Sequence, residues 1–183
     1  MMEFPKPYAD AVARLRVPSG FLIVVVFAWF SNPSPQSLIW GVPVSLVGLA
    51  LRGWAAGCLA KNQRLATGGP YAYVRNPLYA GTLLVAAGLA IASRSIGLAV
   101  LFAIVFLFVY LPVIQNEEQH LRNIFPEYAE YAERVPALFP RFGNGLIGQE
   151  FRLALYLKNQ EYQAGAGFLI GLLYLLWKVA AVR

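Results

Sequence analysis

Two polar motifs contain the residues of this chain whose types and spacing best suit chemistry. The first is GGPYAYVRNPLYAG at Gly68–Gly81, and the second is EEQHLRNIFPEYAEYAERVPALFP at Glu117–Pro140. Asn76 precedes Pro77, so Asn76 is expected to be the N-cap of a helix whose first residue is Pro77. The unpaired amides of that helix start, with Arg75 beside them, predict a site that attracts an anion.

The second motif begins with adjacent carboxylates, Glu117 and Glu118. Adjacent side chains point about 100° apart on a helix, so the two carboxylates are not expected to share a partner. Glu118 is expected to pair with Arg122 one turn later, which leaves Glu117 on the face shared with His120 and Leu121. Both acids are expected to lie at an exposed helix end, where the loss of one charge costs little stability.

The rest of the second motif predicts a short amphipathic helix that starts near Pro126. Its two sides differ in character, with Tyr128, Tyr131, Ala132 and Val135 on one and Glu127, Glu130 and Arg134 on the other. This pattern is typical of a helix that lies in the membrane interface.

Apolar helices must position both motifs. Charged residues make up 13% of the chain, against about 25% in soluble proteins, and no Asp or Glu occurs between Ala11 and Asn116. A bilayer span takes roughly 20 residues, and five apolar segments are candidates, of which the third and fifth are short: Val12–Phe30, Leu38–Ala60, Leu78–Ala92, Ile96–Ile114 and Ala164–Lys178. The chain is therefore expected to be all-α, a polytopic membrane helical bundle of about five transmembrane helices with interfacial helices, in a single domain over residues 1–183.

The loops predict the orientation of this bundle. A turn around Arg94 should return the chain to the side it left, so that both motifs meet at one membrane surface. Basic residues precede the first span and follow the second, whereas the turn at Ser31–Ser37 carries no charge. By the positive-inside rule the N-terminus and both motifs are expected to be cytoplasmic. The net charge of +6 then reflects this bias. The basic residues are scattered along the segments that flank the membrane and do not form a cluster, which argues against nucleic-acid binding.

Three features inside or near the spans also carry expectations. Arg52 lies about two turns inside the second span, where it either snorkels to the interface or meets a headgroup, a cofactor carboxylate or Glu117. GxxxG pairs at Gly53/Gly57 and Gly167/Gly171 predict close helix packing within the bundle. The segment Gln149–Gln163 is expected to form a helix that covers the site.

The combination YAYVRNPLYAG, EEQHL and FPEYAEYAERVPALFP resembles the membrane methyltransferases that include isoprenylcysteine carboxyl methyltransferases and phospholipid N-methyltransferases. The resemblance covers about residues 48–140, and a C-terminal helix at about 164–180 follows. It implies S-adenosylmethionine as cofactor and a lipophilic substrate that enters from the bilayer. The cofactor-binding residues it implies are Tyr73, Val74, Arg75, Asn76, Pro77, Tyr79, Gly81, Glu117, Glu118, His120 and Leu121.

For the chemistry itself, the expected catalytic residues are Arg75, Arg52 and Glu117, and no metal site is predicted. Asn76 stands where the isoprenylcysteine branch usually has histidine, and Pro126 stands where the family commonly has glycine. The acceptor is left open between an isoprenylcysteine-type carboxylate and a lipid amine, and the oligomeric state is also left open. The alternative functions are an NADPH-dependent sterol-type reductase and a non-catalytic membrane scaffold.

Overall fold

The computed structural model of the chain describes residues 5–141, 148 and 150–181, and these residues form helices and no strands. The α-helices are α1 (Lys6–Phe30), α2 (Pro35–Cys58), α3 (Pro77–Ser93), α4 (Ile96–Val105), α5 (Leu111–Ile124), α6 (Tyr128–Arg134), α7 (Leu153–Lys158) and α8 (Tyr162–Ala181). A 3-10 turn, η1 (Gly69–Ala72), precedes α3, and a π-helical turn, η2 (Phe106–Tyr110), joins α4 to α5.

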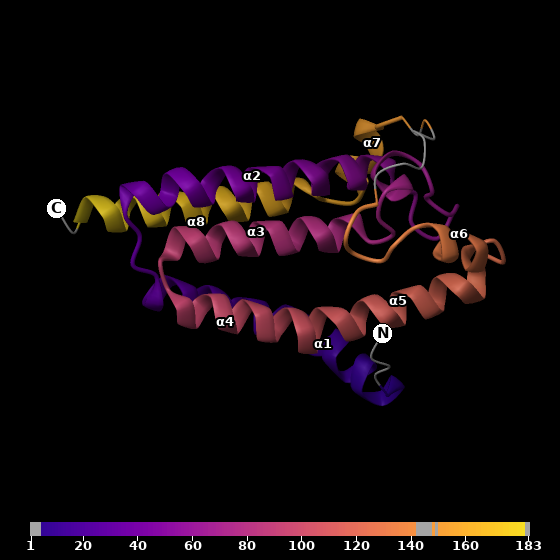
Figure 1. The fold of residues 1–183 in the computed structure, drawn as a ribbon, viewed down its shortest axis with the longest axis horizontal. Helices are drawn as coiled ribbons and strands as arrows, with labels where there is room; N and C mark the ends of the chain where they lie inside the picture. The colour runs from indigo at the N-terminus through magenta and orange to yellow at the C-terminus, as the bar shows by residue number, and fades with distance from the viewer. Residues whose placement is uncertain (1–4, 142–147, 149, 182–183) are drawn as a thin grey trace.

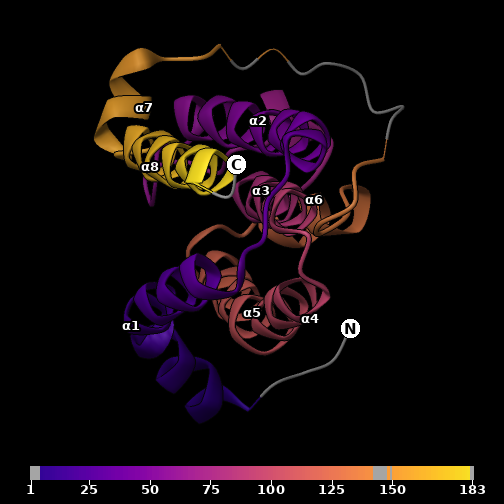
Figure 2. The ribbon, with the colours of Figure 1, turned by 90° about the vertical axis from the view of Figure 1, so that its left-hand side faces the viewer.

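The long helices lie in two layers. Figure 2 shows α2, α3 and α8 in one layer and α1, α4 and α5 in the other. In Figure 1, α1 begins at the end of the bundle where α6 lies, and α8 finishes at the opposite end. The chain therefore passes along the bundle an odd number of times, as five passes require.

Each of the five apolar segments predicted from the sequence forms a helix. Among the described residues, Pro35–Cys58, Ile96–Ile124 and Tyr162–Ala181 are long and apolar enough to cross a membrane, whereas the apolar stretches Gly20–Phe30 and Pro77–Ser93 are shorter. Seventeen residues of α3 rise about 25 Å, just short of a hydrocarbon core of about 30 Å. The structure confirms an all-α membrane bundle, and the number of five spans stays a prediction.

The helix of the fourth apolar segment continues past that segment, as the expected helical position of the acidic pair requires. The helices α4, η2 and α5 form one continuous helix from Ile96 to Ile124, whereas the predicted span covers Ile96–Ile114. The acidic pair therefore lies on a helix that extends beyond the apolar stretch, which fixes its position relative to α3.

Helices α2 and α3 pack with their backbones in contact. A Cβ atom added to Gly48 would lie 2.6 Å from the carbonyl oxygen of Gly81, and one added to Gly81 would lie 2.7 Å from that of Gly48. Gly41 and Gly88 form an equivalent contact two turns farther along. Glycine is required at these positions because any side chain would push the helices apart.

The GxxxG pairs do not make the helix contact that was predicted for them. A Cβ added to Gly167 or Gly171 would meet nothing within 4 Å among the described residues. Gly53 and Gly57 face aromatic side chains from the segment around α7, not a second long helix. The close packing in this bundle instead uses glycines seven residues apart.

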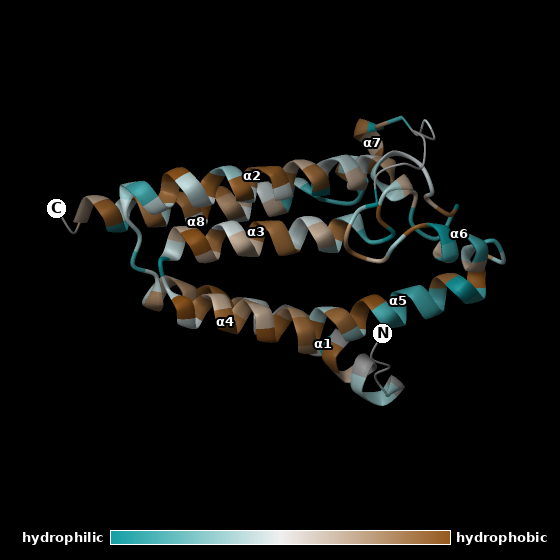
Figure 3. Cartoon of the chain, in the orientation of Figure 1, coloured by the Kyte–Doolittle hydropathy of each residue, from teal (hydrophilic) through white to brown (hydrophobic). Residues whose placement is uncertain are grey.

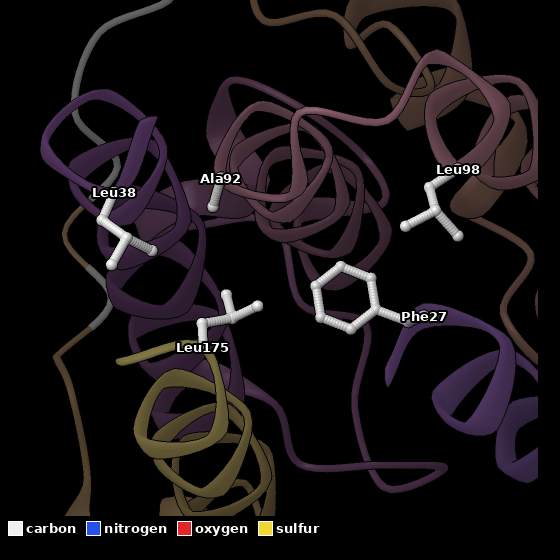
Figure 4. Packing of buried hydrophobic residues seen from close by; sticks show 5 residues of the cluster. All are labelled: Phe27, Leu38, Ala92, Leu98 and Leu175. Atoms are coloured by element: carbon white, nitrogen blue, oxygen red, sulfur yellow. The ribbon is translucent and has the colours of Figure 1, made fainter. Parts of the chain in front are cut away.

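A cluster of buried apolar side chains joins the layers at the end opposite α6. It contains Phe27, Leu38, Ala92, Leu98 and Leu175, which come from five different helices (Figure 4). Lys178 adds a polar link, since its Nζ donates to the carbonyl oxygens of Ala28, at 2.9 Å, and Ser31, at 2.6 Å. These carbonyls end α1, so a cation there also complements the helix dipole.

The other end of the bundle is polar. Figure 3 shows hydrophilic residues concentrated on α5, on α6 and on the loops around them, while the long helices are mainly hydrophobic. The turn at Arg94, which is left-handed with φ of 52°, lies far from this polar end and returns the chain to it. The predicted meeting of the two motifs at one end is confirmed.

Candidate functional site

The first motif starts α3 as predicted, but its asparagine has a different role. Pro77 is the first residue of the helix, and Asn76 occupies the N-cap position without a side-chain capping bond. The Asn76 Nδ2 atom instead donates to Glu118 Oε1, at 2.8 Å, and to the carbonyl oxygen of Ala137, at 3.2 Å. The predicted N-cap position of Asn76 is confirmed, and its side chain binds a carboxylate of α5 because that buried group lies within reach of the amide.

Arg75 and Glu118 form a buried ion pair across the two motifs. Arg75 Nε and Nη2 donate to the two carboxylate oxygens of Glu118, at 3.0 and 3.1 Å. Arg75 Nη1 donates to the carbonyl oxygens of Ala132 and Val135, at 2.6 and 2.7 Å, which end α6. The expected pair between Glu118 and Arg122 was wrong, since Glu118 points into the bundle and Arg122 does not.

This ion pair is largely removed from water, with 11% of the Arg75 side chain and 10% of the Glu118 side chain exposed. Desolvation lowers the pKa of Arg75, but the hydrogen bonds and charge of Glu118 raise that pKa by more, so the net shift is upward. Arg75, which was expected beside a site that attracts an anion, thus holds an internal carboxylate with two hydrogen bonds. Arg75 joins three segments of the protein at this point.

Glu117 is exposed and has a different environment from its neighbour. The hydroxyl of Tyr79 donates to Glu117 Oε1, at 2.8 Å, across the space between α3 and α5. The Tyr79 ring meets the Tyr110 ring edge to face, with centroids 6.0 Å apart. Tyr110 ends the π-helical turn η2, and such turns occur frequently at functional sites. One acid is thus structural, while the other is presented at the surface.

Glu117 lies in the wall of a cavity of about 260 Å³ at the polar end, which we call the polar cavity. Its walls come from the loop after α2, η1, the start of α3, the end of α5 and α6. The residues that line it are Leu59, Lys61, Asn62, Arg64, Leu65, Ala66, Tyr71, Arg75, Asn76, Pro77, Leu78, Tyr79, Glu117, His120, Leu121, Phe125, Tyr128 and Tyr131. This set combines aromatic and aliphatic surface with both signs of charge.

Three tyrosines of this wall are buried and neutral. Burial raises the pKa values of Tyr71, Tyr128 and Tyr131 above that of an ordinary tyrosine. The Tyr131 hydroxyl donates to the Tyr71 carbonyl oxygen, at 2.6 Å, which holds α6 against η1. As predicted, Tyr128, Tyr131 and Val135 share the buried side of α6, and its acidic residues are exposed.

The structure brings together most of the site residues predicted from the sequence. Seven of them line the polar cavity: Arg75, Asn76, Pro77, Tyr79, Glu117, His120 and Leu121. Glu118 lies behind this wall, bound to Arg75 and Asn76.

The remaining residues of the predicted set face elsewhere. Tyr73 and Val74 line a second, apolar cavity, and Gly81 packs against α2. The roles in methyl transfer that the resemblance implies for these residues stay predictions.

Arg52 has a partner that was not considered in the sequence analysis. Its Nε and Nη2 donate to Oε1 and Oε2 of Glu161, at 2.6 and 3.0 Å, and its Nη1 donates to the Leu78 carbonyl oxygen, at 3.3 Å, and to Thr82 Oγ1. Glu161 directly precedes α8. The pair therefore links α2, α3 and α8, and leaves little of the guanidinium for a substrate. The sequence contains a signal that could have predicted this pair: an acidic residue directly before one apolar helix and an arginine inside another.

The C-terminal segment covers a different surface from the one expected. The Arg152 amide donates to the Gly57 carbonyl oxygen, at 2.9 Å, and Asn159 Nδ2 donates to the carbonyl oxygens of Ala56 and Leu59, both at 2.9 Å. The helix α7 thus covers the C-terminal end of α2, and its residues do not line the polar cavity. Gln149, the first residue of the predicted helix, lies outside the described residues.

Sequence reasoning missed part of the cavity wall. Lys61, Arg64 and Tyr71 all line it, yet they were read as loop and interfacial residues. Lys61 and Arg64 belong to the basic cluster after the second span, where positive-inside bias gives a sufficient explanation from sequence alone. Only the fold of this loop over α3 shows that the same cations border a cavity.

Comparisons with known proteins agree with this architecture. Residues 38–128 match the family model described as phospholipid methyltransferase. Nickel-cobalt-cadmium resistance protein NccN of Alcaligenes xylosoxydans xylosoxydans is 40% identical over 152 residues, which are 75% of this chain and 70% of that protein. The cobalt-zinc-cadmium resistance protein CzcN of Cupriavidus metallidurans is 42% identical over 103 residues, which are 55% of this chain and 46% of that protein.

A third relative carries a name that states an activity. Protein-S-isoprenylcysteine O-methyltransferase of Schizosaccharomyces pombe is 28% identical over 141 residues, which are 74% of this chain and 59% of that protein. No solved structure matches the chain. The chain is an integral membrane protein that belongs to the family of isoprenylcysteine carboxyl methyltransferase-like and phospholipid methyltransferase-like proteins.

Proposed function

We propose that this protein transfers a methyl group from S-adenosylmethionine to a lipophilic acceptor, and that the polar cavity is the active site on the cytoplasmic side of the membrane. The observation that carries the proposal is the divided acidic pair. Glu118 is neutralised by Arg75, while Glu117 is exposed in the cavity wall and oriented by the Tyr79 hydroxyl. A fixed, accessible carboxylate in a partly apolar cavity suits a cationic cofactor.

The residues of the cavity fit S-adenosylmethionine chemically. Glu117 can accept hydrogen bonds from an ammonium or ribose hydroxyl group, while Lys61 and Arg64 can attract a carboxylate. The rings of Tyr71 and Phe125 offer flat surfaces to an adenine. When bound, this cofactor supplies a methyl group activated by a sulfonium. The chain's own contribution is to orient the two reactants and exclude water, and orientation alone is worth up to about 7 to 11 kcal/mol.

The acceptor is proposed as a class, either an isoprenylcysteine-type carboxylate or a lipid amine. A carboxylate acceptor needs no base, whereas an amine must lose a proton before it attacks. His120 lines the polar cavity and is exposed, so it is the candidate base for an amine. Labelled methyl transfer into separate protein and lipid fractions of the host membrane distinguishes the two classes of acceptor.

Replacing Glu117 with Gln should weaken cofactor binding. The neutral amide keeps the shape of the side chain but loses the charge, and hydrogen bonds to charged groups are worth about 1.5 to 3 kcal/mol, so the affinity for S-adenosylhomocysteine should fall by roughly tenfold or more. Calorimetric titration of the purified protein in detergent measures this change.

Glu127→Gln is the matched control, because Glu127 is also exposed near the polar end but does not line the cavity. The control should bind S-adenosylhomocysteine as the parent protein does. Equal affinity in the parent and in the Glu117→Gln variant would overturn the assigned role of Glu117. Thermal stabilisation of the parent by NADPH but not by S-adenosylhomocysteine would favour the reductase alternative.

A further inference from the structure

A second cavity lies next to the polar cavity and has a different character. It measures about 530 Å³, and the residues around it are almost all apolar. We call it the interfacial cavity. Leu51 and Trp54 of α2 and Leu83 and Leu84 of α3 form its walls, and the loop Leu138–Pro140 covers it. From Pro77, α3 rises about 10 Å to Leu84, so this cavity extends from the polar end into the apolar part of the bundle.

Backbone hydrogen bonds hold this loop in place on both sides of the interfacial cavity. The amides of Arg75 and Asn76 donate to the carbonyl oxygens of Pro136 and Ala137, at 2.8 and 3.1 Å. Beyond Pro140, the Arg141 amide donates to the Tyr73 carbonyl oxygen, at 3.2 Å. The loop is therefore tethered before and after Leu138–Pro140. A cavity with apolar walls suits hydrocarbon better than water, because water finds few hydrogen-bond partners there.

A basic hollow adjoins the interfacial cavity and shares Phe139 and Pro140 with it. Arg134, Arg141 and one acid, Glu133, also line this hollow. All three charged residues are exposed. Arg134 also lies 3.6 Å from Glu130 in an ion pair on α6, so the cation of this hollow that complements an anionic headgroup is Arg141.

From this arrangement we propose that the interfacial cavity and the basic hollow together bind one anionic phospholipid. One acyl chain lies in the interfacial cavity, against the side of α2 and α3 and beneath the loop Leu138–Pro140, and the phosphate lies against Arg141. The cavity alone gives little preference, since the bilayer is equally apolar, so selectivity arises at the guanidinium. The occupant is a phospholipid, not a peptide, because two apolar helices of the bundle, α2 and α3, form the walls of the cavity.

This lipid site is separate from the proposed active site. The segment Tyr73–Asn76 divides the two cavities, since Tyr73 and Val74 line the interfacial cavity while Arg75 and Asn76 line the polar one. The bound lipid therefore contacts the backbone segment that holds Arg75, without being the methyl acceptor. Lipid binding and cofactor binding can be measured independently.

Native mass spectrometry of the purified protein, mixed with equal amounts of phosphatidylglycerol and phosphatidylcholine of matched chains, tests the proposal. The parent should retain phosphatidylglycerol about fivefold more than phosphatidylcholine, the ratio expected for one basic residue near an anionic headgroup. Arg141→Gln should remove this preference. Lys158→Gln is the control, because Lys158 is exposed at the end of α7 and lines neither cavity nor hollow.

Leu83→Trp tests the position of the acyl chain, because the larger ring fills the interfacial cavity. It should reduce retention of both lipids, and Leu51→Trp provides the same test from the facing helix if the first variant does not fold. Equal retention of the two lipids by the parent, or an unchanged preference in Arg141→Gln, would overturn the anionic headgroup site. Parental retention in a folded cavity-filling variant would overturn the chain site. S-adenosylhomocysteine affinity, measured on the same samples, tests the proposed function separately.

Discussion

Two adjacent carboxylates of this protein have opposite environments, and the difference comes from where the helix places them. Glu118 turns inward and meets Arg75 and Asn76, while Glu117 turns toward the cavity and meets Tyr79. A buried ion pair contributes little net stability compared with an apolar core, but removal of one partner leaves the other charge buried and unpaired. Glu118 is therefore a structural residue, and Glu117 is the acid available to a ligand.

Glu118→Gln should destabilise the fold, whereas Glu117→Gln should not. Loss of the buried carboxylate leaves the charge of Arg75 without its partner, at a cost of about 3 kcal/mol. Loss of an exposed charge is expected to change stability by less than about 0.5 kcal/mol. Thermal unfolding of both variants in the same detergent measures the difference. Similar unfolding temperatures for the two variants would show that the Arg75–Glu118 pair does not hold the motifs together.

Among the elements, α2 and α3 form the contact that fixes the site most directly. Their glycines bring the two backbones together at Gly48/Gly81 and Gly41/Gly88. The first motif begins just after α2 and continues into α3, so a change in this contact moves Arg75 and Tyr79 relative to α5. Gly81, which resemblance assigns to cofactor binding, acts here through helix packing.

Gly48→Ala should weaken the bundle. The added methyl group would lie 2.6 Å from a carbonyl oxygen of α3, and such overpacking typically costs about 1 to 3 kcal/mol. Gly171→Ala in α8 is the matched control, because the same methyl group there meets nothing within 4 Å among the described residues. Thermal unfolding in detergent micelles compares the stability of the two variants. A Gly48→Ala variant as stable as the control would contradict the close backbone contact.

For the whole molecule, the arrangement of the two layers determines where the polar residues gather. The layers are joined at one end by the cluster around Leu175 and by Lys178. At the other end they are joined by Glu117 and Glu118 of α5, which bind Tyr79 and Arg75. The turn between α1 and α2 lies at the first end and α6 lies at the second (Figure 1). The positive-inside rule makes the α6 end cytoplasmic, which remains a prediction.

Cysteine labelling tests this orientation, since the native Cys58 is fully buried and should not be labelled. A membrane-impermeant maleimide added to intact cells should label Ser34→Cys and should label Glu127→Cys only after permeabilisation. The unmodified protein, carrying Cys58 alone, is the control for background. Labelling of both variants in intact cells would place the two ends of the bundle on one side and overturn the passage of the chain between them.

The sequence by itself determined the membrane class, the helical segments and the sharing of one end by the two motifs. These follow from composition, segment length and the turn at Arg94, all of which act locally along the chain. It also predicted that Glu117, Tyr79 and Asn76 belong to one site, and all three line the polar cavity, because the helix start at Pro77 and the acidic pair are visible as short motifs. The resemblance carried by those motifs led to the family that the comparisons established.

The tertiary structure decided which charges meet. The spacing of residues along one helix favoured an ion pair between Glu118 and Arg122. The packing of α3 against α5 and α6 brings Arg75 to Glu118 instead. In the same way, Arg52 finds Glu161 across more than a hundred residues, because α8 begins beside α2. Electrostatic partners in a low-dielectric bundle are chosen by three-dimensional proximity and burial, and neither quantity is contained in the spacing of residues along one helix.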